Sequence, residues 1–481
     1  MKLKSLLENL QVSGSFNEDA EVLDVVSDSR SVKSGSLFVC IRGLRFDGHS
    51  AAQQALEKGA AAVVVDHSLG LEGEVIVDNT RNALAVLCSN YFGRPQEKLK
   101  LIAVTGTNGK TTIANVIKQS LEHCGKKAGL IGTIGIEIGD LTLPAKFTTP
   151  EPWDLEMIFS TMVNAGCEYA VMEASSQALE QGRLYDLHFD TAIFTNLSQD
   201  HLDYHKTMEA YFKAKCMLFE MCDYAVINTD DSAGKTLFAR TSCEKVSYAL
   251  EDPDADYRAH DLSLKIDGSS FQVCSGNCSA YCNVPLPGRF SVYNALSCIA
   301  TVHRAVGDLQ KSCEAVSNTR GVSGRCEILH RWPKTVICDY AHTDDALMKL
   351  LSSVKPYVGD GKLIVLFGCA GRRDKTKRIK MAKVVAEYAD VAVLSSDNPR
   401  DEDPFEIMHA LEPVFLGNRV PYLLIPDRYF AVSHVVGEMK DDDVFVLCGK
   451  GHEDYQVEDG YTMYLDERRI VRDYFDKEQR E

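Results

Sequence analysis

The stretch that decides the fold is Leu101-Ile-Ala-Val-Thr-Gly-Thr-Asn-Gly-Lys-Thr-Thr112. A short apolar run ends there at a glycine-rich turn, and apolar residues at helical spacing follow from Ile113 to Leu121. Backbone N–H groups in such a turn can all point toward phosphate oxygens, and the N-terminus of the following helix adds partial positive charge. The sequence therefore predicts a strand, a loop and a helix that together bind a triphosphate.

The loop is tighter than the usual P-loop, which has the pattern G-x-x-x-x-G-K-[ST]. Val104 stands where that pattern has its first glycine, and the available glycine is Gly106. Lys110 can reach the outer phosphates, and the hydroxyl of Thr111 can bind Mg²⁺. A turn without a ligand is the alternative, and it is disfavoured because strand, lysine, threonines and helix are all in register.

Length and composition set the broad class of the protein. A chain of 481 residues predicts about three domains, and 45% hydrophobic with 25% charged residues is typical of a globular protein. The net charge of −17 disfavours non-specific binding to nucleic acid or to an anionic membrane, so an anionic ligand needs a local basic pocket. Glu8 and Asn9 interrupt the apolar start, and no run reaches transmembrane length. We expect a cytoplasmic monomer.

The sixteen cysteines are expected to be mostly buried thiols, because a reducing compartment disfavours disulfides. Cys274, Cys278 and Cys282 are spaced as C-x3-C-x3-C. Zinc sites more often begin with C-x2-C and supply four ligands, and no nearby histidine completes the set. We interpret this segment as a strand hairpin rather than a metal site.

The chain divides into three predicted blocks, at 1–97, 98–324 and 325–481. The first ends in a polar linker with proline and contains predicted strands and a helix, at 36–41, 60–65 and 51–58. The second alternates apolar runs with helical segments, which favours a largely parallel sheet. Its predicted strands are at 170–172, 191–194 and 224–227, followed by hairpin strands within 262–285 and a closing helix at 293–306.

The third block repeats a unit of strand, polar loop and helix five times. The predicted strands are 335–338, 363–367, 391–394, 422–425 and 444–447. This pattern predicts a doubly wound α/β fold, in which ligands bind beyond the carboxyl ends of the strands. Most of the polar clusters of this block follow a predicted strand.

Three residues of the second block are candidates for a metal site. Glu173 follows a predicted strand, where a carboxylate near a phosphate loop can hold Mg²⁺ directly or through water. His201, in Asn196-Leu-Ser-Gln-Asp-His-Leu-Asp-Tyr-His205, either binds a second cation or starts a capped helix. Lys215 lies on the inner face of a helix predicted from Thr207 to about Cys222, where the alternative is that it snorkels to solvent.

The third block offers a basic pocket in an acidic protein. Its basic residues cluster at Arg372, Arg373, Lys375, Lys377 and Arg378. A solvated patch and a nucleic-acid patch are the alternatives, and the net charge disfavours the second.

A turn in the same block provides a better-defined basic side chain. Pro399 stiffens the turn that ends in Arg400, so the direction of this arginine is restricted. An arginine held in this way is suited to bidentate hydrogen bonding with a carboxylate. Asp397 and Glu453 can hold an ammonium group. Together these groups describe a pocket for a zwitterionic amino acid.

These motifs, taken in order, resemble the Mur ligases of peptidoglycan synthesis over nearly the whole chain. The stretches that carry the resemblance are Thr105-Gly-Thr-Asn-Gly-Lys-Thr-Thr112, Met172-Glu-Ala-Ser-Ser176, Asn196 to His205, Gly288-Arg-Phe-Ser-Val-Tyr-Asn294, Asp339-Tyr-Ala-His342, Asp397-Asn-Pro-Arg400 and Gly449-Lys-Gly-His-Glu-Asp-Tyr-Gln456. One departure is Thr343-Asp344-Asp345, where the family commonly has Thr-Pro-Asp.

The resemblance implies a small α/β domain that binds the uridine nucleotide, a central P-loop ATPase-like domain and a Rossmann-like domain. It implies ATP contacts by the loop Gly106, Thr107, Asn108, Gly109, Lys110, Thr111 and Thr112, and by Asn294, Arg325 and Asp339. It implies contacts to the UDP-muramoyl substrate by Ser29, Arg30, Thr148, Thr149, Ser175, Gln181 and Arg183. It implies an amino-acid site at Arg373, Asp397, Asn398, Pro399, Arg400, Gly449 and Glu453.

The resemblance also implies a modified lysine and a reaction. Lys215 matches a carbamylated lysine that, with Thr111, Glu173 and His201, holds Mg²⁺, in two sites in all. The implied catalytic residues are Lys110, Glu173, His201 and Lys215. The implied activity is ATP-dependent addition of meso-diaminopimelate to the D-glutamate of UDP-N-acetylmuramoyl-L-alanyl-D-glutamate through an acyl phosphate, and Arg400 favours diaminopimelate over lysine. The alternatives are the same ligation with L-lysine, a ligase of the folylpolyglutamate synthetase type, and a non-catalytic nucleotide-dependent switch.

Overall fold

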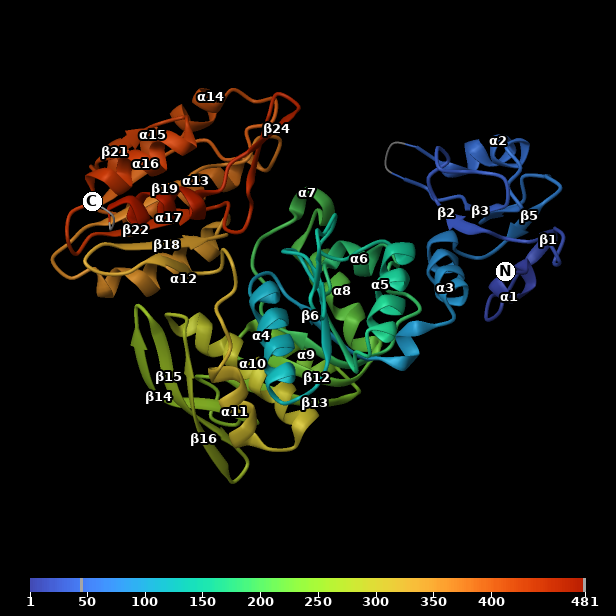
Figure 1. Ribbon diagram of the computed structural model, residues 1–481, viewed down its shortest axis with the longest axis horizontal. Coiled ribbons are helices and arrows are strands. Elements are labelled where there is room, and N and C mark those ends of the chain that lie inside the picture. The colour runs from blue at the N-terminus through green and yellow to red at the C-terminus, as the bar shows by residue number, and fades with distance from the viewer. Residues whose placement is uncertain (44–45, 479–481) are drawn as a thin grey trace.

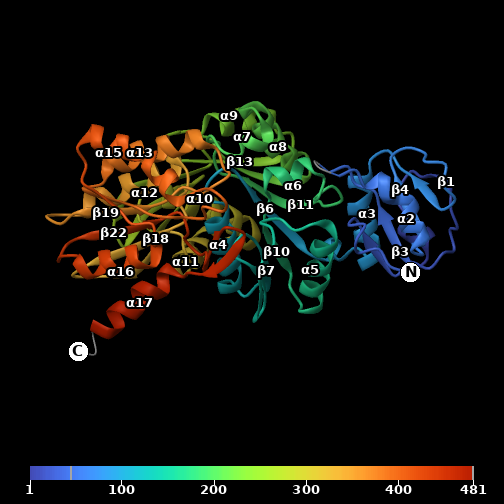
Figure 2. The same cartoon turned by 90° about the horizontal axis from the view of Figure 1, so that it is seen from above.

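The computed structural model describes residues 1–43 and 46–478 as three α/β units that follow one another along the molecule (Figure 1). The N-terminal unit lies at one end, and the C-terminal unit lies at the other end beside the central unit (Figures 1 and 2). Within the described residues, no helix is long and apolar enough to cross a membrane.

The N-terminal unit is a five-stranded sheet in which β1 alone runs antiparallel. Its strands, in spatial order, are β1 (Ser13–Ser15), β5 (Glu74–Ile76), β4 (Ala62–Val65), β3 (Ser36–Val39) and β2 (Asp24–Val26). Its helices are α1 (Leu3–Leu6), η1 (Gly48–Ala51, a 3₁₀ helix), α2 (Ala52–Glu57) and α3 (Thr80–Phe92). The central strands β3 and β4 are buried on both faces, as expected for apolar runs without alternation.

The central unit is built on an eleven-stranded sheet whose middle is parallel. In spatial order the strands are β16 (Cys278–Val284), β15 (Gly268–Ser275), β14 (Tyr257–Lys265), β13 (Glu244–Ala249), β12 (Cys222–Asn228), β11 (Phe189–Phe194), β6 (Lys100–Thr105), β10 (Tyr169–Glu173), β7 (Ala128–Ile131), β8 (Ile136–Ile138) and β9 (Leu141–Leu143). The antiparallel strands lie at its two edges.

Helices cover both faces of this sheet. Side chains of α4, α10 and α11 fill the core on one face, and those of α5, α6 and α9 fill the core on the other. The helices are η2 (Pro95–Lys98), α4 (Lys110–His123), α5 (Pro152–Asn164), α6 (Ser176–Glu180), α7 (Leu202–His205), α8 (Met208–Cys216), η3 (Met217–Glu220), α9 (Ser232–Arg240), α10 (Arg289–Val306) and α11 (Leu309–Ser317).

Two expectations for this unit have clear outcomes. The helix predicted to reach Cys222 ends at Cys216 and continues only as the 3₁₀ turn η3, because Cys222 already pairs with Phe189 as the first residue of β12. The cysteine-rich segment is a pair of antiparallel strands, as predicted. Cys282 faces the core while Cys278 is exposed, so the three thiols do not converge on a metal.

The C-terminal unit is a six-stranded sheet that is parallel except for β17. In spatial order its strands are β17 (Glu327–His330), β18 (Thr335–Asp339), β22 (Val444–Cys448), β19 (Leu363–Phe367), β20 (Val391–Leu394) and β21 (Tyr422–Leu424), and a separate hairpin pairs β23 (Tyr455–Glu458) with β24 (Tyr461–Tyr464). Its helices are α12 (Asp344–Val354), η4 (Lys355–Tyr357), α13 (Lys375–Tyr388), α14 (Pro404–His409), α15 (Glu412–Asn418), α16 (Arg428–Glu438) and α17 (Glu467–Glu478). Side chains of α12, α13 and α15 pack on one face and those of α16 and α17 on the other, which makes the unit doubly wound, as predicted.

Candidate active site

The phosphate loop is shaped by two glycines whose backbone other residues rarely adopt. Gly106 follows β6 with φ of +144°, and a Cβ there would lie 1.8 Å from Oγ1 of Thr195. Gly109 has φ of +94°, and a Cβ there would lie 2.7 Å from Oδ1 of Asn294. Helix α4 begins directly after it at Lys110. The close neighbours of both positions explain why this loop needs glycine at 106 rather than at 104.

The loop opens into a cavity of about 960 Å³ that the central and C-terminal units line together. The expected site residues that line it are Thr107, Asn108, Gly109, Lys110, Thr111, Thr112, Thr148, Thr149, Glu173, Ser175, Arg183, His201, Lys215, Asn294, Arg325, Asp339, Arg373, Asp397, Asn398, Arg400, Gly449 and Glu453. Gln181 and Pro399 are each next to a lining residue. Oε1 of Gln181 accepts a hydrogen bond from Nε of Arg183, and Pro399 directly precedes Arg400 in the chain. Ser29 and Arg30 lie in the N-terminal unit instead, where Arg30 pairs with Asp28 at 2.7 Å.

Glu173 ends β10 with its carboxylate buried at the base of the cavity. Oγ1 of Thr111 donates to Oε2 of Glu173 at 2.9 Å, and the backbone N–H of Thr133 donates to Oε1 at 2.7 Å. Both of these partners are neutral groups. Hard oxygen donors of this kind suit Mg²⁺.

Lys215 and Lys110 are two cations that converge on one backbone carbonyl. Nζ of Lys215 donates to the Gly106 carbonyl at 2.8 Å, and Nζ of Lys110 donates to the same oxygen at 2.9 Å. Lys215 is 1% exposed, so it faces inward as predicted and the alternative, that it snorkels to solvent, is wrong. Burial, followed by the charge of Lys110, holds the pKa of Lys215 well below its usual range. The amine is thus driven toward its neutral, nucleophilic form.

His201 lies at the N-cap position of α7, where its side chain makes no hydrogen bond that caps the helix, and it lines the cavity, so its binding of a cation stays a prediction. Its backbone is left-handed, with φ of +52°, and its Nε2 is 3.6 Å from Oδ2 of Asp200. Desolvation in the cavity lowers the pKa of His201 to about 4, with Lys110 and Lys215 adding to the effect and Asp200 opposing it. The imidazole is therefore neutral at pH 7, the form that can bind a metal.

A second group of side chains connects β10 to the wall of the cavity. Arg183 donates through Nη1 to the Thr149 carbonyl at 2.9 Å and pairs with Glu151 at 3.0 Å. Oγ1 of Thr149 donates to the backbone carbonyl of Glu173 at 2.8 Å and accepts from the N–H of Ser175 at 3.0 Å. These hydrogen bonds fix the positions of Thr149 and Ser175 relative to Glu173.

The C-terminal unit contributes a charged pocket at the carboxyl ends of β20 and β22. Lys450 is fully buried there, 3.2 Å from Oε2 of Glu453 and 3.8 Å from Oδ1 of Asp397. Asn398 donates to the same oxygen of Glu453 at 3.0 Å. Arg400 has φ of +58°, and its guanidinium donates to the Gly371 carbonyl.

Polar contacts join the two halves of the cavity. Nη2 of Arg325 donates to Oγ1 of Thr111 at 3.1 Å, Nδ2 of Asn108 donates to Oδ2 of Asp345 at 2.7 Å, and Lys377 pairs with Asp200 at 2.8 Å. The variant Thr343-Asp344-Asp345 stretch is a well-formed helix start, since Oγ1 of Thr343 accepts from the N–H of Ala346 at 3.1 Å. The phosphate loop and the charged pocket thus face one shared cavity.

Comparison with known sequences accounts for this arrangement. Residues 104–302 match the Mur ligase middle domain, 324–451 match the Mur ligase glutamate ligase domain, and 23–91 match the Mur ligase family catalytic domain. The chain belongs to the Mur ligase family. It is therefore an ATP-dependent, ADP-forming ligase, as the resemblance implied.

Full-length relatives of this Mur ligase include two curated proteins named UDP-N-acetylmuramoyl-L-alanyl-D-glutamate--2,6-diaminopimelate ligase. Those of Clostridium perfringens and Geobacillus thermodenitrificans are each 40% identical to it, over 98% of this chain and 99% of their own. A solved structure of a ligase with the same name has a TM-score of 0.73 at 31% identity, covering 100% of this chain and 99% of its own. The MurF ligase of Thermotoga maritima in complex with ADP shares the fold, with a TM-score of 0.62 at 17% identity over 96% of this chain and 99% of its own.

Sequence reasoning missed several residues that line the Mur ligase cavity or contact its lining. Lys450 was present in the quoted Gly449-Lys-Gly-His-Glu stretch, but a lysine between two glycines gave no sign of burial. Thr133 and Asp345 make their contacts through positions that no local motif marks. The signal available for Asp345 was its place in the Thr343-Asp344-Asp345 stretch that departs from the family pattern.

Proposed function

We propose that this Mur ligase joins the amine of meso-diaminopimelate to the D-glutamate carboxylate of UDP-N-acetylmuramoyl-L-alanyl-D-glutamate. The observation that carries the proposal is that the phosphate loop and the Arg400 pocket line one cavity. The two curated relatives named for this reaction cover nearly the whole chain and agree with it. The peptide would be extended in peptidoglycan synthesis.

ATP would bind with its phosphates over the N-terminus of α4. The backbone N–H groups of the loop and the ammonium of Lys110, which line the cavity there, would neutralise the β- and γ-phosphates. Arg325, which reaches Thr111 from the C-terminal domain, adds a cation on the opposite side. Asn294 and Asp339 would contact the nucleotide from the same cavity wall. This preorganised charge is the main source of rate enhancement in phosphoryl transfer.

The residues present fit a magnesium site. Thr111 and Glu173 provide bonded oxygen donors, His201 provides a neutral nitrogen, and Lys215 as a carbamate would provide a further carboxylate. Mg²⁺ held there would neutralise charge on the triphosphate. Carbamylation of Lys215 also explains why a lysine is buried beside Lys110, because it replaces a second cation by an anion.

The chemistry proceeds in two steps whose groups are set by the cavity. A carboxylate oxygen of the D-glutamate attacks the γ-phosphorus of ATP, and the bond between this phosphorus and the oxygen that bridges to the β-phosphate breaks. ADP is released, and the D-glutamate carries an acyl phosphate. The neutral amine of diaminopimelate then attacks the acyl carbon, inorganic phosphate departs, and the amine loses its proton as the amide forms. Contacts such as Asn108 with Asp345 join the two halves of the cavity, and further closure around the acyl phosphate would exclude water.

The amino acid would be recognised by charge in the C-terminal domain. Asp397 and Glu453 carry two negative charges and the buried Lys450 one positive charge, so the set offers one net negative charge to an ammonium group. Arg400 would pair with the carboxylate that diaminopimelate has and lysine lacks. Arg373, Asn398, Pro399 and Gly449 would shape the rest of this pocket.

The nucleotide substrate would extend from the cavity to the N-terminal domain. Thr148, Thr149, Ser175, Gln181 and Arg183 would contact its muramoyl-peptide part in the cavity wall. Ser29 and Arg30 would contact the uridine nucleotide in the N-terminal domain. The separation of these two sets in the structure requires a long ligand or a movement of that domain.

One experiment separates the proposal from its alternatives. The protein is incubated with ATP and the UDP-muramoyl-dipeptide, with diaminopimelate, with L-lysine or with neither, and release of phosphate and formation of tripeptide are measured together. Phosphate release that requires diaminopimelate and matches tripeptide formation is expected. Release without any amino acid would support a switch, and preference for lysine would overturn the assigned amino acid.

Lys110→Ala is expected to abolish both products, and tripeptide formation at the wild-type rate in that variant would contradict the role of Lys110.

A further inference from the structure

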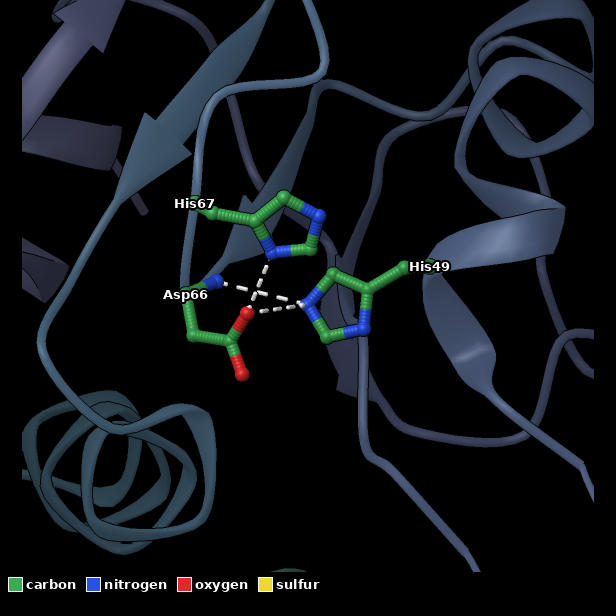
Figure 3. Close-up of side chains that lie close together, drawn as sticks. All are labelled: His49, Asp66 and His67. Atoms are coloured by element: carbon green, nitrogen blue, oxygen red, sulfur yellow. Dashed lines mark hydrogen bonds and ion pairs between the residues drawn. The ribbon is translucent and has the colours of Figure 1, made fainter.

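A second group of ligand-type side chains lies in the N-terminal domain, outside the lining of the active-site cavity. His49 belongs to η1, and Asp66 and His67 directly follow β4 (Figure 3). Oδ1 of Asp66 lies 3.2 Å from Nε2 of His49 and 2.5 Å from Nδ1 of His67. One ligand atom of each residue lies within 4.8 Å of those of the other two. Two imidazole nitrogens and a carboxylate oxygen therefore converge on one point.

The tautomer of His49 leaves the lone pair on Nε2, where a backbone N–H now donates and an ion would replace that donor. Nδ1 of His49 donates to Oδ1 of Asp47 at 2.6 Å, and Nε2 accepts from the backbone N–H of Asp66 at 3.3 Å. The same oxygen of Asp47 also accepts from the backbone N–H of His49 at 3.0 Å, which holds the carboxylate in place. A histidine oriented by a carboxylate at its remote nitrogen is the usual arrangement of a metal-binding histidine.

The three side chains differ in how far they are exposed to solvent. The His49 side chain is 5% exposed, that of Asp66 is 23% exposed and that of His67 is 50% exposed. The buried histidine supplies a preformed anchor, while His67 is free to adjust. The exposed side leaves room for an ion to enter and for water to complete its coordination.

We propose that His49, Asp66 and His67 bind a divalent transition-metal ion, with Zn²⁺ the best match. Two nitrogens and one carboxylate suit Zn²⁺ rather than Mg²⁺, which prefers oxygen ligands. With bonds of about 2.0–2.1 Å, tetrahedral ligand atoms lie about 3.3 Å apart. The pair His49 and Asp66 already has this spacing at 3.2 Å, and the half-exposed His67 needs only to draw back.

Arg42 is the group that competes with a metal at this site. Its Nη2 lies 3.0 Å from Oδ1 of Asp66 and 3.4 Å from Nδ1 of His67, so its positive charge stands beside the two accessible ligands. Its side chain is 60% exposed and can leave. Removing this charge should strengthen metal binding, which is the opposite of what damage to the domain would do.

A bound ion would connect η1 to the end of β4. This link is independent of ATP and of the ligase reaction proposed above. Because an ion that binds only the folded chain stabilises it by mass action, the site predicts a rise in melting temperature with added Zn²⁺.

The test is a titration of the metal-stripped full chain with Co²⁺, followed by absorption spectroscopy in excess Mg²⁺ to occupy the ATP-linked site. One equivalent of Co²⁺ with d–d bands and no thiolate charge-transfer band is expected for wild type. His67→Ala and Asp66→Asn should lose these bands and the Zn²⁺-dependent rise in melting temperature. His188→Ala is the matched control, because it removes another exposed histidine–aspartate pair, His188 with Asp223 at 2.8 Å, and should behave as wild type.

Two further variants sharpen the result. Arg42→Ala should bind Co²⁺ more tightly than wild type, and Asp47→Asn should bind about 10–100-fold more weakly. Wild type without d–d bands, thiolate charge transfer from the cysteines, or unchanged bands in His67→Ala would overturn the site. Weaker binding by Arg42→Ala would also count against it.

Discussion

Arg428 and Glu467 form an ion pair from which solvent is excluded, with Nε of Arg428 2.7 Å from Oε1 of Glu467. The other two guanidinium nitrogens donate to the carbonyls of Ser396 and Cys448, at 3.1 Å and 2.7 Å. Each carbonyl immediately precedes a residue of the proposed amino-acid pocket, Asp397 in one case and Gly449 in the other. The pair therefore joins the ends of β20 and β22 beneath that pocket.

This relationship predicts a selective effect on amino-acid binding. Arg428→Met should raise the KM for diaminopimelate by about tenfold to a hundredfold, because small displacements of binding groups have costs of that size. The KM for ATP should change little, since the phosphate loop belongs to another domain. The Arg428→Met substitution should also lower the melting temperature, because it leaves Glu467 buried without its partner.

Arg469→Met is the matched control for this experiment. Arg469 lies on α17, the helix that contains Glu467, and its pair with Asp473 at 3.5 Å is exposed. It should leave both KM values unchanged. Equal rises in both KM values for Arg428→Met would show a general loss of structure rather than positioning of the pocket.

Carbamylation of Lys215 is the second prediction. The lowered pKa of this lysine favours the neutral amine, which can react with CO₂ and lose a proton to give a carbamate. Activity should fall when CO₂ and bicarbonate are removed and return when they are restored. Protein in ¹³C-bicarbonate should show a carbamate carbon signal by NMR that Lys215→Ala lacks. A signal that persists in Lys215→Ala, or activity indifferent to CO₂, would contradict this assignment.

Discrimination between diaminopimelate and lysine is the third prediction. Arg400→Ala should reduce kcat/KM for diaminopimelate by about tenfold to a hundredfold, the range for losing a charge-assisted hydrogen bond of about 1.5–3 kcal/mol. Any weak activity with lysine should survive, because lysine lacks the carboxylate. Arg372→Ala is a suitable control, since Arg372 is exposed and pairs with Asp401 at the surface. Equal losses with both amino acids would rule out Arg400 as the group that recognises the carboxylate.

The protonation of His201 is the fourth prediction. Its pKa is about 4, because desolvation and the positive charge of Lys110 disfavour the imidazolium more than Asp200 favours it. Its ring signals in NMR should therefore stay constant from pH 8 to pH 5 and shift only on further acidification. Lys110→Met removes a positive charge that faces the imidazole and should raise the pKa. A His201 transition near the ordinary value of about 6.5 in the wild type would contradict this account of the cavity.

Local patterns were sufficient where the chain folds by its own periodicity. The apolar run before Gly106 and the helical spacing after Gly109 specified β6 and α4, because strand and helix periods are properties of neighbouring residues. The five repeats of the C-terminal domain were recognised for the same reason. Strands such as β1, with the sequence Ser-Gly-Ser and full exposure, were missed because they carry no apolar alternation and form only by pairing with β5.

The charged interior could not be predicted in the same way. Lys450 and Arg428 have sequence neighbourhoods typical of solvent-exposed residues, yet both are buried. Their partners Asp397 and Glu467 lie 53 and 39 positions away in the sequence and come close only when the strand ends of one sheet meet.

The sequence by itself determined that this chain has a phosphate loop, a doubly wound C-terminal domain and the residue set of a Mur ligase. These are properties of short stretches, whose spacing fixes both the backbone and the chemistry. Only the tertiary structure decided that Lys215 is buried against the Gly106 carbonyl and that Arg428 supports two pocket strands from below. It also brought His49 and Asp66 together, because burial and charge depend on which distant segments enclose a side chain.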